Sequence, residues 1–141
     1  MATVRLLIVE DHDFFRHTIR LLLEADERIA VVGMAASGEE AIALAESQRP
    51  DVVLLDLNLA SGSGLAVMQK LSVSSGRPLV LVLTGADDAQ SLRGAFVAGA
   101  RGYLCKDQVT DDLLISAIFA VVHGGVFVDA RTFALLLSLW A

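Results

Sequence analysis

Five short apolar runs, separated by segments with helical periodicity, restrict the possible folds of this chain more than any other feature. The runs are Leu6–Val9, Ile29–Ala35, Val52–Leu55, Leu79–Leu83 and Tyr103–Cys105. Short runs rich in valine and leucine are typical of strands that are buried on both faces. Their alternation with helical segments predicts an α/β fold, in which helices cover both faces of a doubly wound parallel sheet.

Helix-start and helix-stop signals support this alternation. Ser37 and Glu40 have the spacing of a capping box, in which each side chain bonds to the backbone near the other residue. That helix is expected to end before Pro50, because the residue that precedes proline avoids helical dihedral angles. Further helices are expected over residues 12–25 and from Thr110 onward, where two acids follow in the first turn.

Composition limits the class of protein. The chain has 141 residues, of which 55% are hydrophobic, so it can bury the core of one domain. It contains no apolar run of the roughly 18 residues that a membrane span needs. The N-terminus has no signal-peptide layout, and the single Cys105 cannot form an internal disulfide. A net charge of −6 without a basic cluster argues against nucleic-acid binding by this segment. We therefore expect a cytoplasmic protein that contacts neither membrane nor nucleic acid directly.

Polar side chains follow four of the predicted strands at the point where each strand ends. Glu10 and Asp11 follow the first strand, and Asp56 ends the third. Thr84 ends the fourth strand and Lys106 the fifth. The carboxyl ends of parallel strands lie at one edge of a sheet, where ligands bind in such folds. The sequence therefore predicts that three carboxylates, a hydroxyl and an ammonium group meet at this edge.

This set of groups suits phosphoryl chemistry. Three crowded carboxylates repel one another unless a cation joins them, and oxygen ligands favour a hard cation such as Mg²⁺. An ionised Asp56 could then act as a nucleophile that forms an aspartyl phosphate. Lys106 and the Thr84 hydroxyl are suited to neutralise the phosphoryl oxygens. The simpler alternative is that Lys106 pairs with a carboxylate and Thr84 caps a helix.

The chain resembles the receiver domain of two-component response regulators over residues 4–125. The residues that carry the resemblance are Glu10, Asp11, Asp56, Gly64, Thr84, Tyr103 and Lys106. Lys106-Asp107, together with the run from Ala98 to Tyr103, is most similar to the subfamily with a helix-turn-helix output domain. The resemblance implies a flavodoxin-like (βα)5 fold with strand order 2-1-3-4-5 and an extra C-terminal segment.

The resemblance also implies roles for the strand-end residues. Asp56 would accept a phosphoryl group from a histidine kinase or a phosphotransfer protein. Mg²⁺ would be bound by the side chains of Asp11 and Asp56 and by the backbone carbonyl of Asn58, and Glu10 would complete the acidic pocket. A domain of this kind is a phospho-acceptor rather than a multiple-turnover enzyme.

Thr84 and Tyr103 are similar to the switch pair of the family. The resemblance implies that the hydroxyl moves to the phosphoryl group, that the ring turns inward behind it, and that Lys106 assists the chemistry. The surface that would change is built by the fourth helix, the fifth strand and the fifth helix. One departure from the family is Ala60, which stands where proline is usual, so the loop of residues 60–64 is expected to be more mobile.

The C-terminal part carries two further expectations. The helix that follows Thr110 is apolar nearly all round, which indicates either packing under the C-terminal tail or a homodimer interface. The tail is expected to form an extra helix from about Ala130. We therefore divide the chain into a receiver domain at residues 1–125 and an extension at 126–141, which docks, forms an interface or begins a linker.

Three other functions remain open at this point. The chain could be a receiver-like interaction module that is not regulated by phosphorylation. It could also be the N-terminal part of a DNA-binding transcription regulator. An aspartyl-phosphate hydrolase of the haloacid dehalogenase kind is the third, although that class needs a second carboxylate where Asn58 stands.

Overall fold

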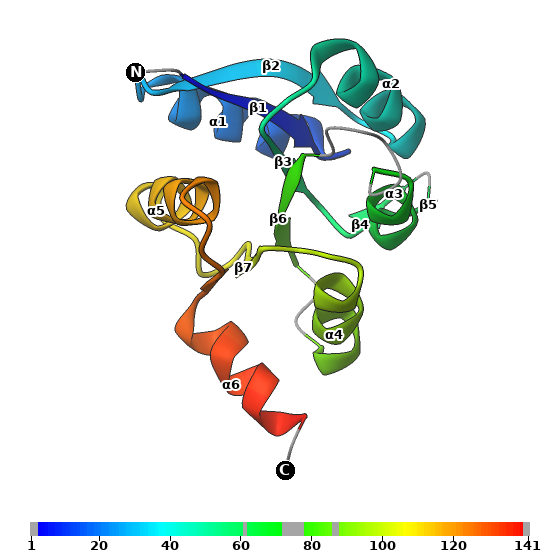
Figure 1. Cartoon of the computed structure of the whole chain (residues 1–141), viewed down its shortest axis with the longest axis vertical. Helices are drawn as coiled ribbons and strands as arrows, with labels where there is room; N and C mark the ends of the chain where they lie inside the picture. Colours follow the sequence, from blue (N-terminus) through cyan, green and yellow to red (C-terminus); the bar gives the residue numbers. More distant parts are fainter. Residues whose placement is uncertain (1–2, 61, 72–77, 86–87, 140–141) are drawn as a thin grey trace.

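The protein was analysed as a computed structural model that describes residues 3–60, 62–71, 78–85 and 88–139. Within these residues, the main sheet is fully parallel and has the order β2-β1-β3-β6-β7-β8 (Figure 1). Its strands are β1 (Val4–Val9), β2 (Ile29–Ala35), β3 (Val52–Leu55), β6 (Leu79–Thr84), β7 (Gly102–Cys105) and β8 (Phe127–Val128). The first five strands confirm the predicted flavodoxin-like order 2-1-3-4-5.

Helices cover both faces of the sheet. They are α1 (Asp13–Glu24), α2 (Gly38–Gln48), α3 (Gly64–Leu71), α4 (Ala89–Val97), α5 (Asp111–Val122) and α6 (Ala130–Ser138). Apolar residues of α2, α3 and α4 share one core cluster, and those of α1 and α5 share the other (Figure 1). The strands Val52–Leu55 and Gly102–Cys105 lie between the two clusters. Every residue in them is therefore buried.

Side chains at the helix starts largely match the sequence signals. The Ser37 hydroxyl accepts from the Glu40 N–H at 3.2 Å, as the capping box predicts. The Glu40 carboxylate instead reaches the Ala36 N–H at 3.3 Å, one residue earlier than in the usual reciprocal pair. Thr110 and Asp129 cap α5 and α6 in the same manner. These caps satisfy backbone donors that the first helical turn leaves unpaired.

Three short strands were not predicted. The two-residue strand β8 extends the sheet beyond β7, through register pairs Gly102↔Phe127 and Tyr103↔Val128. A short antiparallel pair is formed by β4 (Asn58–Leu59), just before the loop of residues 60–64, and β5 (Gly62–Ser63), within that loop. Gly62 has a φ of 147°, which residues with a side chain rarely adopt, and this allows the chain to reverse there. Ser61 lies outside the described residues.

The C-terminal segment forms the helix that was expected from Ala130, at the end of the molecule away from β2 (Figure 1). Thr132 is completely buried, and its hydroxyl donates to the Tyr103 carbonyl at 3.3 Å. The large apolar side chains that are most exposed lie mainly on α1 and α6, and they include none from α5. Among the described helices, none combines the length and the apolar character required to cross a bilayer.

Candidate functional site

The acidic residues come together because β1 and β3 are hydrogen-bonded neighbours. Val9 pairs with Leu55 in the sheet, and the Asp56 N–H donates to the Val9 carbonyl at 3.0 Å. Glu10, Asp11 and Asp56 therefore leave adjacent strands at the same edge. Each offers a carboxylate oxygen, and these oxygens lie within 4.8 Å of one another.

The three carboxylates differ in their exposure to solvent. Glu10 and Asp56 are only 4% and 5% exposed, while Asp11 is half-buried. Three negative charges at this separation repel strongly, and burial reduces the screening by water. The site therefore needs compensating positive charge.

Lys106 supplies one positive charge. Its Nζ lies 3.0 Å from Oδ2 of Asp56 and forms a second ion pair with Oε1 of Glu10. The backbone holds this side chain in place, because the Lys106 N–H donates to the Thr84 carbonyl at 3.0 Å. The Phe15 ring adds a cation–π contact, with its centroid 4.6 Å from Nζ.

Asp56 receives hydrogen bonds on both of its carboxylate oxygens. The Thr84 hydroxyl donates to Oδ1 at 2.8 Å, and the Asn58 N–H donates to the same oxygen at 3.0 Å. Lys106 donates to Oδ2. These donors fix the orientation of the carboxylate, which is the group that can act as a nucleophile.

The buried ion pairs also affect the acid–base behaviour of their members. Burial raises the pKa of the Glu10 carboxyl above its ordinary value, against the hydrogen bond from Lys106 that lowers it. Burial opposes the charge of Lys106, but hydrogen bonds and charges from Glu10 and Asp56 outweigh it, so the pKa of the ammonium group is raised. Lys106 is therefore fully protonated at neutral pH.

Asp11 is held by the loop that follows β3. Its Oδ2 accepts a hydrogen bond from the Ala60 N–H at 2.5 Å. The Gly64 N–H donates to the Leu57 carbonyl at 2.8 Å and closes the loop. A Cβ on Gly64 would lie 2.5 Å from the Asp56 carbonyl oxygen, so only glycine fits this position.

Tyr103 lies apart from the carboxylates. Its side chain is completely buried, and its ring packs 6.5 Å from the Phe96 ring of α4. The ring is already turned into the protein, whereas the resemblance implied an inward movement. Tyr103 pairs with Val82, two residues before the Thr84 position in β6, so it lies behind the site in the sheet register.

Residues 10–16 contribute three contacts that the sequence did not point to. Arg16 donates to the Glu10 carbonyl at 2.8 Å and pairs with Asp13, and Phe15 lies against Lys106. Phe15 lies within the helix predicted over residues 12–25, but its contact with Lys106 depends on how that helix packs. Arg16 had no signal in the sequence, because its role depends on how α1 leaves β1.

The donor set fits a hard divalent cation. Three carboxylates and one ammonium group leave a net negative charge at the oxygen cluster, and its ligand atoms are all oxygens. Carboxylate oxygens are preferred ligands of Mg²⁺, and nitrogen or sulfur ligands would favour softer metals. Asp11 is the most accessible of the three and the best placed to bind an ion that enters from solvent.

Comparison with known protein families identifies the domain. The response regulator receiver domain matches residues 6–118. Nitrate/nitrite response regulator protein NarL of Escherichia coli (strain K12) is 36% identical over 136 residues, which are 96% of this chain and 63% of that protein. Oxygen regulatory protein NreC of Staphylococcus epidermidis is 36% identical over 129 residues, 91% of this chain and 59% of that protein. The chain thus spans about three fifths of these relatives.

Solved structures share the fold. A two-component response regulator of the LuxR family from Aurantimonas sp. SI85-9A1 has a TM-score of 0.91, 29% identity and 99% coverage of both chains. The signal receiver domain of the putative response regulator NarL from Mycobacterium tuberculosis has a TM-score of 0.83 and 27% identity, covering 88% of this chain and 99% of that one.

Proposed function

This chain belongs to the response regulator receiver domain family of two-component signal transduction, and we propose that it acts as a phosphorylation switch with Asp56 as the acceptor. The observation that carries the proposal is the environment of Asp56. It is a buried carboxylate with hydrogen-bond donors on both oxygens, at the edge where three acids and one lysine meet. The proposed donor is a phosphohistidine of a histidine kinase or of a phosphotransfer protein.

The proposed reaction is a phosphoryl transfer. A carboxylate oxygen of Asp56 attacks the phosphorus atom and forms a new P–O bond. The P–N bond to the donor imidazole breaks, its electron pair stays on nitrogen, and solvent supplies the proton for that nitrogen if it is needed. The product is one aspartyl phosphate per chain, so the chain is consumed as the acceptor rather than turning over repeatedly.

Charge stabilisation supports this reaction. A bound magnesium ion, held by Asp11, Asp56 and the Asn58 carbonyl, would supply positive charge toward the phosphoryl oxygens. Lys106 is oriented by Glu10 and carries its charge beside Asp56. The Thr84 hydroxyl donates to Asp56 and would turn toward an oxygen of the phosphoryl group. These groups act by electrostatics and positioning, as expected for phosphoryl transfer.

The proposed switch follows from the Thr84 hydrogen bond. When the hydroxyl donates to the phosphoryl group, the end of β6 shifts relative to β7 and changes the surface formed by α4, β7 and α5. Tyr103 lies buried behind this surface and packs against α4, so its ring would report or transmit the change. In a longer protein, this surface would control an output domain such as those of transcriptional regulators.

A labelling experiment tests the proposal. The 141-residue chain is incubated with Mg²⁺ and a small phosphoryl donor such as acetyl phosphate, and the phosphorylated fraction is measured by intact-protein mass spectrometry. We expect labelling of the parent chain, none of Asp56→Asn, and none after Mg²⁺ is chelated. Asp51→Asn is the matched control, because it carries the same change at the other end of β3. Equal labelling of Asp56→Asn and the parent would show that another residue is the acceptor.

A further inference from the structure

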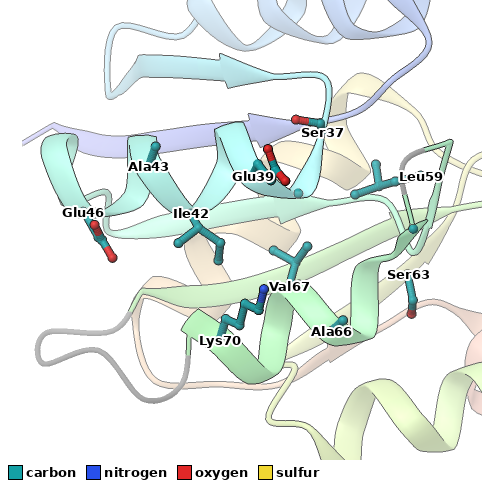
Figure 2. A pocket seen from close by; sticks show the side chains of 12 residues that line it. Ser37, Glu39, Ile42, Ala43, Glu46, Leu59, Ser63, Ala66, Val67 and Lys70 are labelled. Carbon is teal, nitrogen blue, oxygen red and sulfur yellow. The ribbon is translucent and has the colours of Figure 1, made fainter.

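A solvent-open groove lies between α2 and α3, beside the loop that follows β3. Its volume is about 650 Å³, and the β4–β5 pair closes one end (Figure 2). Figure 2 shows Ile42 of α2 and Val67 of α3 pointing toward each other across it. Leu59 of β4 completes an apolar floor. A groove of this size and lining can hold several side chains of a ligand.

Charged side chains lie at the rim of the groove. Glu39 and Glu46 project from α2, and Lys70 projects from α3 (Figure 2). All three are exposed. Within the described part of the chain, none of them forms an ion pair or a side-chain hydrogen bond, in contrast to the carboxylates of the acidic site. The rim therefore carries two unpaired negative charges on one side and one positive charge on the other.

The spacing of the two acids limits what can occupy the groove. Glu39 and Glu46 are seven residues apart, which is two helical turns or about 10.5 Å along α2. A second helix that lies along α2 presents residues i and i+7 at the same spacing. Basic residues at those positions would pair with both acids, while apolar residues between them would fill the floor formed by Ile42 and Val67.

The floor of the groove is already formed in the free chain. Leu59 and Val67 are buried, and Gly38 lets α2 approach α3 closely, since a Cβ there would lie 2.9 Å from a methyl group of Val67. The β4–β5 pair is fixed by the bond from Gly64 to Leu57. Binding would therefore require little rearrangement of the chain, which lowers its entropic cost.

We propose that the groove between α2 and α3 binds a cationic amphipathic helix of a partner protein, with basic residues two turns apart that pair with Glu39 and Glu46. An acidic residue on the opposite edge of that helix would face Lys70. The overall charge of −6 favours the approach of such a partner. This inference does not depend on phosphorylation of Asp56.

Two synthetic peptides test the proposal by fluorescence anisotropy with the full chain. Both are labelled 15-residue helices with the same leucine face; one carries Lys at i and i+7 with Glu on the opposite edge, and the other has these charges reversed. We expect the first peptide to bind at least about tenfold more tightly, because each charge reversal replaces an attraction by a repulsion. Equal affinity of the two peptides, or no binding of the first, would overturn the proposal.

Variants of the chain locate the binding site. Glu39→Lys/Glu46→Lys is expected to weaken binding of the Lys peptide by about tenfold or more. Glu27→Lys/Asp112→Lys makes the same change in net charge at two exposed acids away from the groove, and it should weaken binding less than threefold. A similar loss in both double variants would mean non-specific attraction and would overturn the proposal.

A third variant tests whether the peptide enters the groove itself or only contacts its charged rim. Ala66 is an exposed, small residue that lines the groove, so Ala66→Trp should fill it without disturbing the core. We expect at least a fivefold loss of affinity for the Lys peptide, with unchanged labelling of Asp56. Unchanged peptide binding would contradict the proposal. Sedimentation that showed a dimer dispersed by Ala66→Trp would assign the groove to a second copy instead.

Discussion

Two aspartates flank the same buried strand, β3, and only one of them lies in the candidate functional site. Asp51 precedes β3 and is exposed; its carboxylate accepts one backbone hydrogen bond, from the Arg5 N–H at 2.8 Å. Asp56 follows β3, is 5% exposed, and receives donors from Thr84, Asn58 and Lys106. Both residues adjoin the same apolar run, Val52–Leu55, so the difference arises from what the sheet brings to each end of the strand.

The parallel direction of the strands explains this difference. At the end where Asp56 lies, β1, β3, β6 and β7 are each followed or ended by a polar residue, and these residues lie close together at one edge of the sheet. At the other end the chain enters the strands from helices, and the acids there are more exposed and have fewer partners. Asp26, for example, is bound to Arg28 two residues away. The reactive groups therefore lie at the carboxyl ends of the strands, the carboxyl edge. The amino ends of the strands, the amino edge, carry surface ion pairs.

The largest effect is expected from Lys106→Met, because it removes the only ammonium group that contacts Asp56 among the described residues. The rate of labelling by acetyl phosphate should fall by about 10²-fold, as is typical when a group that stabilises transition-state charge is removed. Lys70→Met removes an exposed lysine of α3 and should leave this rate unchanged. Equal rates for the two variants would mean that Lys106 has only a structural role.

Gly64→Ala tests how tightly the loop after β3 is built. The new Cβ would meet the backbone of Asp56 and Leu57, so the free energy of unfolding should fall by about 1–3 kcal/mol. Gly85→Ala is the control, because a Cβ at that position would meet no atom within 4 Å among the described residues beyond its chain neighbours. Urea unfolding monitored by circular dichroism measures both. A control variant that lost as much stability would remove the steric explanation.

Thr84→Val tests the hydrogen bond that distinguishes Asp56 from Asp51. It keeps the shape of the side chain but removes a buried donor, so we expect a loss of about 1 kcal/mol in the free energy of unfolding, together with slower labelling. Thr84→Ser retains the hydroxyl and should keep most of the labelling rate. If the valine variant were labelled faster than the serine variant, the hydroxyl would not assist the reaction.

The smallest effect concerns the amino edge. Hydrogen bonds from Arg28, first from its side chain and then from its backbone, lower the pKa of Asp26 from 3.8 to about 2. Because the folded pKa is lowered, the small stabilisation from this pair is present above pH 3.8 and is lost as the pH falls through about 2. NMR titration of the Asp26 carboxyl carbon measures this pKa, and Arg28→Gln should return it to the ordinary range.

The sequence predicted which polar residues meet at the carboxyl edge of the sheet, because this depends only on which segments are strands and on their order. Val52–Leu55 reads as a buried strand on its own, and the polar residues that follow such runs must share an edge. The likeness to receiver domains then gave the strand order, which the register of β1 and β3 confirms. The chemical roles assigned to the site residues remain proposals, those of Asp56 and Lys106 as much as those of Asn58 and Tyr103.

Features that depend on distances between separate elements were not predicted. The strand β8 has only two residues and gains its identity from pairing with β7. The contact of Phe15 with Lys106 depends on where α1 crosses the end of β1. The groove between α2 and α3 requires the close approach at Gly38, which a one-dimensional pattern does not contain. Local periodicity describes elements, and these features arise only when the elements pack.

The central claim is that the phosphoryl group is carried by Asp56 and not by another acid of the site. Reduction of the labelled chain with borohydride converts an aspartyl phosphate to homoserine, and peptide mass spectrometry then locates the modified position. We expect homoserine at position 56 alone, with Asp11 and Asp51 unchanged. Homoserine at position 11 or 51, or a phosphoryl group on a side chain that borohydride does not reduce, would contradict this account of the protein.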